Sequence, residues 1–160
     1  DGGKSYSIKP PINFETWQEK LQDEYVLLLR THAYTNEVLG VKFNEFVHDF
    51  SQYPEINHLL MATDILISDY SAIIFDYSIL EKPIICFGYD YEEYAKERGL
   101  YIDLEVELPS GVMRTEEEVI KKIKDMNYFV ESKKTADFKR KYLEVGGNAT
   151  IQCINSLLKL

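Results

Sequence analysis

Residues 64–76, DILISDYSAIIFD, join a short apolar run through a polar turn to a second apolar segment. The run Asp64–Ser68 is typical of a buried strand, and the residues after it predict a helix from about Tyr70 to Leu80. Apolar runs at 25–30 and 83–87 also predict strands, and 45–50 is a further strand candidate. Helices are expected from Asn13 to about Gln22 and from Pro54. Because short apolar runs alternate with helices, the sequence predicts an α/β fold with a doubly wound, Rossmann-like parallel sheet.

The last third of the chain has a helical pattern. Thr115 and Glu118 have the spacing of a capping box, which predicts a helix that continues to about Lys124. Further helices are expected over about 132–143 and 148–158, separated by a break at Gly146 and Gly147. The segment 101–107 is expected to form an edge strand or an extended loop.

The composition is that of one folded domain. The chain has 160 residues, of which 45% are hydrophobic and 28% charged, so it can form a core and is not disordered. No apolar run approaches the roughly 18 residues that a membrane-spanning helix needs. The first eleven residues, DGGKSYSIKPP, lack the apolar core of a signal peptide and are typical of a loop cut from a longer chain. We therefore expect residues 1–160 to be a single domain of a longer protein.

The net charge of −9 argues against binding of nucleic acid and against direct binding to an anionic membrane. The acidic group Asp90, Glu92 and Glu93 is expected on a solvated face. The same is expected of the densest basic group, which falls late in the chain and consists of Lys133, Lys134, Lys139, Arg140 and Lys141.

The two cysteines, Cys86 and Cys153, are far apart and lack metal-binding spacing, so both are expected to be buried thiols in a reducing compartment. The chain also lacks the P-loop, GxGxxG, GxSxG and HExxH motifs. NTP hydrolysis by a Walker fold, NAD-linked redox chemistry, α/β-hydrolase action and zinc proteolysis therefore lose support. Neither zinc nor a disulfide is indicated, no metal-ligand residues and no cofactor are expected, and the sequence leaves metal dependence open.

In open parallel sheets, ligands bind beyond the carboxyl ends of the strands. The polar residues Ser68, Asp69 and Ser71 follow one such end, and two compatible interpretations are open. The Ser68 and Ser71 hydroxyls and the helix N–H groups can hold a phosphate, or these residues simply cap the helix. Asp76, within the same helix, could accept hydrogen bonds from ribose hydroxyls or lie exposed to solvent.

Two other predicted strand ends carry polar residues. Arg30, Thr31 and His32 end the first strand. Arg30 can bind phosphate, and His32 is either a general acid or base, or a donor to a leaving group, or only a hydrogen-bonded loop residue. Asp49 and Ser51 end the next strand, where they could shape a base pocket or form a turn.

The run at 53–77, YPEINHLLMATDILISDYSAIIFDY, resembles the CDP-glycerol glycerophosphotransferases of teichoic-acid synthesis. The resemblance extends to LRTH at 29–32, KPI at 82–84, YD at 89–90 and RGLY at 98–101, and it covers most of residues 25–155. It implies the donor half of a two-domain GT-B enzyme, in which the C-terminal Rossmann-like domain holds the CDP-linked donor. Such enzymes transfer glycerol phosphate to a hydroxyl of a membrane-linked acceptor and release CMP.

The resemblance also implies roles for individual residues. Arg30, Thr31 and His32 would contact the diphosphate, with His32 as the catalytic histidine of this domain. The backbone N–H groups of Ser71 and Ala72 would bind phosphate beside Ser68 and Asp69, and Asp76 would meet the ribose or a nearby polar group. The chain departs from the family at Ala72, where a second serine is common, and at 146–150, GGNAT, where the family has Asp-Gly-Lys-Ala-Ser.

The partners implied by the resemblance are a CDP-glycerol or CDP-ribitol donor and a membrane-linked polyol-phosphate acceptor. The acceptor would bind an N-terminal domain outside this chain, which would also supply a second histidine as the base, and the first strand of the donor domain would lie outside the chain too. The enzyme would act in bacterial cell-wall synthesis, peripherally at the cytoplasmic face of the membrane, and a homo-oligomer is compatible with it. Two alternatives stay open: a GT-B glycosyltransferase domain for UDP- or GDP-sugars, and a non-catalytic module for protein association.

Overall fold

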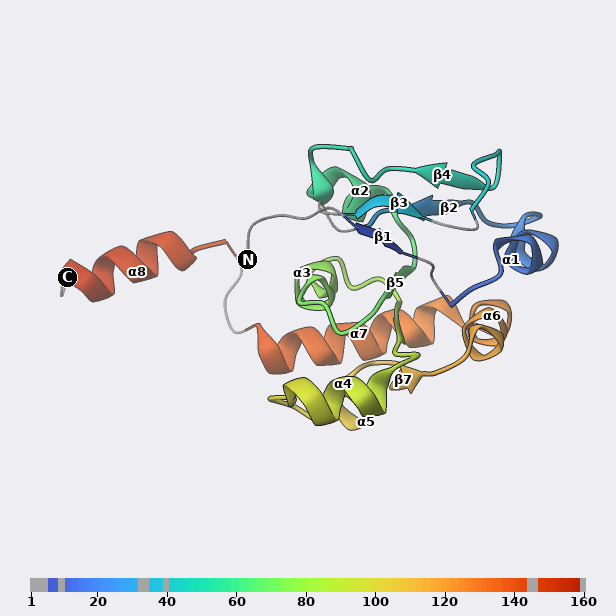
Figure 1. Cartoon of the computed structure of the whole chain (residues 1–160). Helices are drawn as coiled ribbons and strands as arrows, with labels where there is room; N and C mark the ends of the chain where they lie inside the picture. Colours follow the sequence, from blue (N-terminus) through green and yellow to red (C-terminus); the bar gives the residue numbers. More distant parts are fainter. Residues whose placement is uncertain (1–5, 9–10, 32–34, 39–40, 144–146, 159–160) are drawn as a thin grey trace.

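The structure, a computed structural model, describes residues 6–8, 11–31, 35–38, 41–143 and 147–158. Helices and strands alternate along most of this part of the chain (Figure 1). The elements are, in chain order, β1 (Tyr6–Ile8), α1 (Phe14–Leu21), β2 (Leu27–Leu29), β3 (Thr35–Val38), β4 (Val47–Asp49), α2 (Ile56–Ala62), β5 (Leu66–Ser68), α3 (Ile73–Ser78), β6 (Ile84–Phe87), α4 (Tyr91–Arg98), α5 (Leu104–Glu107), β7 (Val112–Met113), α6 (Glu116–Lys124), α7 (Tyr128–Tyr142) and α8 (Ala149–Leu158).

The described strand pairs are all parallel. Strand β2 pairs with β4, β6 pairs with β5 on one side and β7 on the other, and β1 pairs with β3. Helix α3 lies in the connection between β5 and β6, and α4 and α5 lie between β6 and β7, as crossovers between parallel strands require. The predicted α/β class with parallel strands is confirmed.

Strand β6 shows why the fold is doubly wound. Its residues Ile84, Ile85 and Cys86 are all at most 1% exposed, although alternate side chains of a strand point to opposite faces. Ile85 belongs to a core that includes residues of α1 and α6, whereas Ile84 and Cys86 belong to a second core that includes residues of α3 and α7. A strand covered on both faces must be apolar throughout, and this explains the uninterrupted run at 83–87.

Helix caps follow the sequence signals closely. The Asn13 side chain accepts hydrogen bonds from the amides of Glu15 and Thr16 and begins α1, as predicted. The capping box of Thr115 and Glu118 is present at the start of α6. Helix α7 begins four residues earlier than the sequence indicates, because Asn127 caps it by accepting from the amide of Val130.

Other expectations were wrong. The segment 101–107 contains the short helix α5, which Asp103 caps by accepting from the amide of Glu105 at 3.0 Å. The strands β1, β3 and β7 were not predicted; β7 is only two residues long. Cys86 is buried as expected, but Cys153 is exposed. Cys153 lies on α8, and no other described part of the chain covers this helix.

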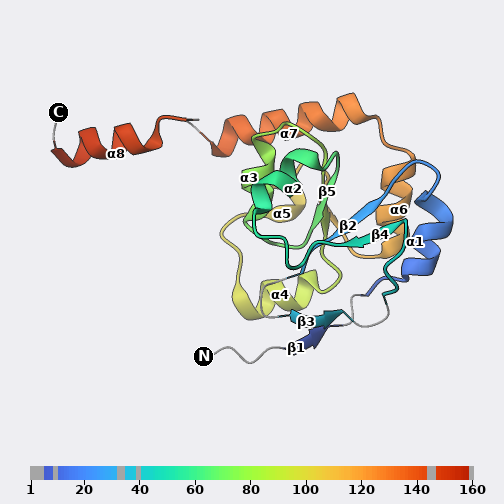
Figure 2. The same ribbon diagram turned by 90° about the horizontal axis from the view of Figure 1, so that it is seen from above.

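The helices pack around the strands in two groups. Helix α6 lies beside α1, and α7 lies beside α3 (Figures 1 and 2). Helix α8 lies apart from the other elements in both views. In the described residues, we find no helix whose length and apolar character would suit a bilayer crossing.

Candidate functional site

The turn between β5 and α3 is built by short-range hydrogen bonds. The Asp69 carboxylate accepts from the amide of Ser71 at 3.0 Å, and the Ser71 hydroxyl accepts from the amide of Ile73 at 3.4 Å. Both bonds span two residues and order the turn, whereas the residue at the start of α3, Ala72, makes no side-chain cap. They leave the Ser71 hydroxyl hydrogen available to an acceptor. Helix α3 begins at Ile73 rather than near Tyr70 and has six residues, so its dipole adds little attraction for an anion.

A second group of polar residues lies at the ends of β2 and β4. The guanidinium of Arg30 donates through Nη1 to the carbonyl oxygens of Phe50, at 3.2 Å, and Tyr53. The Thr31 hydroxyl donates to the Ser51 hydroxyl at 3.1 Å, and the amide of Ser51 donates to the Asp49 carboxylate at 2.8 Å. The turn interpretation of Asp49 and Ser51 is thus observed, and Arg30 holds that turn against the end of β2.

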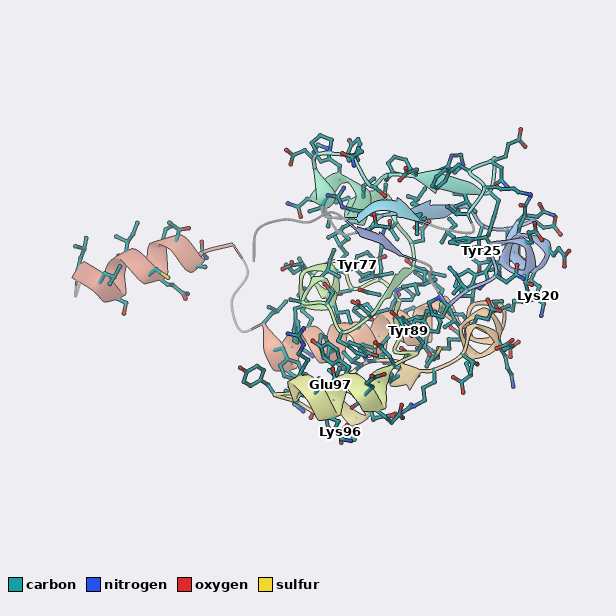
Figure 3. All side chains as sticks on the ribbon, viewed as in Figure 1. Lys20, Tyr25, Tyr77, Tyr89, Lys96 and Glu97 are labelled. Atoms are coloured by element: carbon teal, nitrogen blue, oxygen red, sulfur yellow. The ribbon has the colours of Figure 1, made fainter. Side chains whose placement is uncertain are left out.

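A third group lies beyond β6 and β7. The Tyr70 hydroxyl donates to Asp90 Oδ1 at 2.5 Å, and the Tyr70 ring packs on the ring of Tyr94 with centroids 4.3 Å apart. Tyr89, in the turn before α4, is half exposed, and Lys96 and Glu97 lie further along α4 (Figure 3). The expectation of a solvated acidic face holds for Glu93, which is exposed, but not for Asp90, whose carboxylate binds Tyr70.

Arg114, directly after β7, joins α4 to α5. Its Nε donates to Glu92 at 2.6 Å, its Nη2 donates to Glu105, and its guanidinium carbon lies 5.1 Å from the ring centroid of Tyr91. The hydrogen bond to Glu105, followed by the one to Glu92, raises the pKa of Arg114 above its ordinary value. Because its charge is already matched by two carboxylates, Arg114 supplies little positive potential to a ligand.

The structure places the predicted residues in separate groups. Ser68, Asp69, Ser71 and Ala72 share the β5–α3 turn. Among the described residues, no hydrogen bond or ion pair joins this turn to Arg30 and Thr31. His32 lies outside the described residues.

Asp76 and the basic group of α7 both lie toward solvent. The Asp76 side chain is exposed, which is compatible with both interpretations of this residue. On α7, Lys139 pairs with Glu81 at 2.8 Å, while Arg140 pairs with Asp137 and Lys141 with Glu107. These ion pairs support the solvated-face interpretation of the basic group, because each of these three charges has a nearby acid.

The described residues offer no group of three or more His, Cys, Asp or Glu side chains arranged for a metal ion. The Cys86 thiol lies beneath the β5–α3 turn, with its sulfur 3.7 Å from the carbonyl oxygen of Asp69. Burial, with the nearby Asp69 and Glu105 carboxylates, raises the pKa of Cys86 to about 12. A thiol with so high a pKa stays protonated at neutral pH and is a poor nucleophile.

Sequence reasoning did not single out Tyr70 and Asp90 as a pair. Both stand in stretches that carry the family resemblance, yet they are separated by 20 residues and belong to different turns. Neither residue by itself shows periodicity or motif spacing that points to the other. Asp90 at the start of a helix is an ordinary capping signal, so the sequence held no sign of its actual partner.

Comparisons with known proteins show which family this chain resembles. The family model described as CDP-Glycerol:Poly(glycerophosphate) glycerophosphotransferase matches residues 1–158. The chain is 35% identical over 122 residues to the teichoic acid poly(ribitol-phosphate) polymerase of Bacillus spizizenii, covering 75% of this chain and 20% of that protein. It is 34% identical over 148 residues to the teichoic acid poly(glycerol phosphate) polymerase of the same species, covering 90% of this chain and 38% of that protein.

A solved structure shows the same fold. The wall teichoic acid polymerase TagF, in a form soaked with CDPG, aligns with a TM-score of 0.76 and 26% sequence identity, over 99% of this chain and 42% of that chain. The chain therefore spans less than half the length of each of these relatives.

Proposed function

This chain belongs to the CDP-glycerol:poly(glycerophosphate) glycerophosphotransferase family, and from this premise we propose that it is the donor-binding domain of such an enzyme. The enzyme transfers glycerol phosphate from CDP-glycerol to a hydroxyl of a teichoic-acid-type acceptor and releases CMP. The observation that carries the proposal is the match of the family model to residues 1–158, within which 53–77 folds as the α2–β5–turn–α3 unit. The turn in this unit lies at the carboxyl end of a parallel strand, where ligands of such sheets bind.

The donor diphosphate is held by two sets of groups in this proposal. The Ser71 hydroxyl can donate to a phosphate oxygen, because its oxygen already accepts from the amide of Ile73 while its hydrogen is free to turn. Arg30 uses Nη1 for the carbonyls of Phe50 and Tyr53, so its remaining N–H groups can donate to phosphate. Thr31, Ser68, Asp69, Ala72 and Asp76 are proposed donor contacts on the strength of the matched sequence.

Transfer at phosphorus needs stabilisation of the charge that develops on the departing CMP. Arg30 is suited to this electrostatic part, and His32 is proposed to donate a hydrogen bond or a proton to the leaving phosphate. The base for the acceptor hydroxyl is assigned to a part of the protein other than this chain. We further propose that residues 1–160 act as one domain of a two-domain protein that works at the cytoplasmic face of a bacterial membrane on a membrane-linked acceptor.

Calorimetric titration of the protein with CDP-glycerol, CDP-ribitol, CDP, CMP and UDP tests the proposal. Both CDP-alcohols are included because the relatives named above are polymerases of ribitol phosphate and of glycerol phosphate. We expect the cytidine diphosphates to bind more tightly than UDP, and Ser71→Ala and His32→Ala each to weaken binding about tenfold, the effect of losing one hydrogen bond to a charged group. Ser156→Ala is a matched control, because this serine is exposed on α8, apart from the strand ends.

Other outcomes have definite meanings. Preference for a UDP- or GDP-sugar would favour the glycosyltransferase alternative. A folded protein that binds none of these nucleotides would contradict the donor-binding role of the chain and favour a module for protein association.

A further inference from the structure

Tyr70 lies between two residues of the proposed donor site but faces another part of the fold. Asp69 and Ser71 hydrogen-bond to each other within the β5–α3 turn, whereas the Tyr70 hydroxyl donates to Asp90 in the turn that precedes α4. Burial, followed by the hydrogen bond to Asp90, raises the pKa of Tyr70 above its ordinary value. The phenol therefore stays protonated and remains a donor throughout the neutral range.

Asp90 has an unusual role for its position. It is the residue before α4, where an aspartate side chain ordinarily accepts from the amides of the first turn. Its side chain makes no such capping bond and instead accepts from Tyr70 at 2.5 Å. The carboxylate thus connects two turns that are 20 residues apart, at the cost of a local cap for its own helix.

The position of the Tyr70 ring is also determined by its neighbours. The ring packs on Tyr94 with centroids 4.3 Å apart, and the Tyr91 ring centroid is 5.9 Å away. Gly88, at the end of β6, leaves the room that the ring fills. A Cβ at position 88 would lie 2.8 Å from Tyr70 Cε1 and 2.5 Å from Val112 Cγ1, so a larger residue there would displace the ring.

We propose that Tyr70 is a positioning residue, which through Asp90 and the space left by Gly88 holds the Asp69–Ser71 turn in the orientation that binds the donor. The inference rests on the proposed function. A side chain flanked by two ligand contacts controls the direction of both, because the three residues share one short stretch of backbone. Small changes in such geometry reduce binding and turnover strongly.

The test compares Tyr70→Phe, Asp90→Ala and Asp90→Asn with the unmodified protein. Tyr70→Phe and Asp90→Ala should weaken CDP-glycerol binding about tenfold, and Asp90→Asn should recover most of the affinity because its amide oxygen still accepts a hydrogen bond. Tyr94→Phe is the matched control, because it keeps the stacked ring and removes a hydroxyl to which the described residues give no hydrogen bond.

A second measurement does not depend on the ligand. Native-state hydrogen exchange should become about tenfold faster at the amide of Ser71 in Tyr70→Phe and stay unchanged in Tyr94→Phe. If the unmodified protein binds CDP-glycerol and Tyr70→Phe binds it equally well, the positioning role is overturned. If the unmodified protein does not bind CDP-glycerol, the proposed function fails, and exchange at Ser71 then decides whether Tyr70 orders the turn: faster exchange supports this, and equal exchange overturns it.

Discussion

Glu131 on α7 is a buried charged residue between two lysines. Its side chain is 8% exposed, and its Oε1 lies 2.9 Å from Lys122 Nζ and 2.8 Å from Lys134 Nζ. Burial by itself raises the pKa of Glu131, but the hydrogen bonds from Lys134 and Lys122 outweigh it and hold the pKa below its ordinary value. Removing one partner of a buried ion pair costs stability, because the charges that remain have lost their match.

The free energy of unfolding should therefore depend on pH through Glu131. Its folded-state pKa lies below the unfolded value of about 4.3, so ionised Glu131 stabilises the fold above that pH, and this contribution disappears as the pH falls through the folded-state pKa. We expect Glu131→Gln to lower the free energy of unfolding by about 1–3 kcal/mol at pH 7 and by progressively less below about pH 4.3.

Urea unfolding at a series of pH values from about 7 to about 3 measures this difference. Glu117→Gln is the control, because Glu117 is an exposed glutamate in the first turn of α6. A difference between wild type and Glu131→Gln that stays constant over the whole series would contradict the assignment.

Helices α1 and α6 are joined by one carboxylate at their N-terminal ends. Glu116 Oε2 accepts from the amide of Asn13 at 2.7 Å and from Trp17 Nε1 at 3.1 Å. Trp17 is 2% exposed, so its indole N–H would otherwise be nearly buried without a partner. The first turn of α6 thus satisfies a polar group of α1 and fixes how the two helices pack.

Loss of this link should affect both helices together. Glu116→Ala is expected to lower the free energy of unfolding by about 1–3 kcal/mol, because it leaves the Trp17 N–H and the Asn13 amide unpaired. Glu117→Ala, which removes the same charge from the same turn, should change it by less than about 0.5 kcal/mol. The chain has a single tryptophan, so its fluorescence during chemical unfolding reports directly on this contact. Equal effects of the two substitutions would mean that the helix dipole, and not the link to α1, is what Glu116 contributes.

Across the whole molecule, burial is concentrated in two cores on the two faces of β6, and α8 contributes to neither. Every described residue of α8 is exposed, including Ile151 at 59% and Leu157 at 81%. The free energy of unfolding of the rest of the chain should therefore depend little on this helix.

Removal of residues 147–160 should leave the unfolding free energy of the rest unchanged within about 0.5 kcal/mol. In contrast, Ile123→Ala in α6 should lower the free energy of unfolding by about 2–5 kcal/mol, because Ile123 is 4% exposed in the core that α6 shares with α1. Thermal unfolding followed by circular dichroism distinguishes the two results. A truncated protein as unstable as Ile123→Ala would show that α8 packs on the rest of the chain in solution.

Much of this organisation was predictable because its causes are local. The predicted strand segments contain β2, β4, β5 and β6. The run at 84–87 is the clearest of them, since a strand buried on both faces must be apolar along its length. The caps at Asn13 and Thr115 need only residues within three positions. The polar residues after β5 could likewise be placed at a strand end from sequence, although their role as donor contacts stays a prediction.

What the sequence by itself determined is therefore the class of the fold, the order of strands β2, β4, β5 and β6 and of most helices, and the polar turn at the end of β5. Only the tertiary structure decided what lies against that turn. A two-residue strand such as β7 has no periodicity and exists because β6 supplies its hydrogen-bond partners, and the bond between Tyr70 and Asp90 depends on two crossovers bringing distant turns together. Local preferences act over a few residues, whereas these contacts form only when the whole sheet is assembled, and this is the physical reason that the sequence alone did not reveal them.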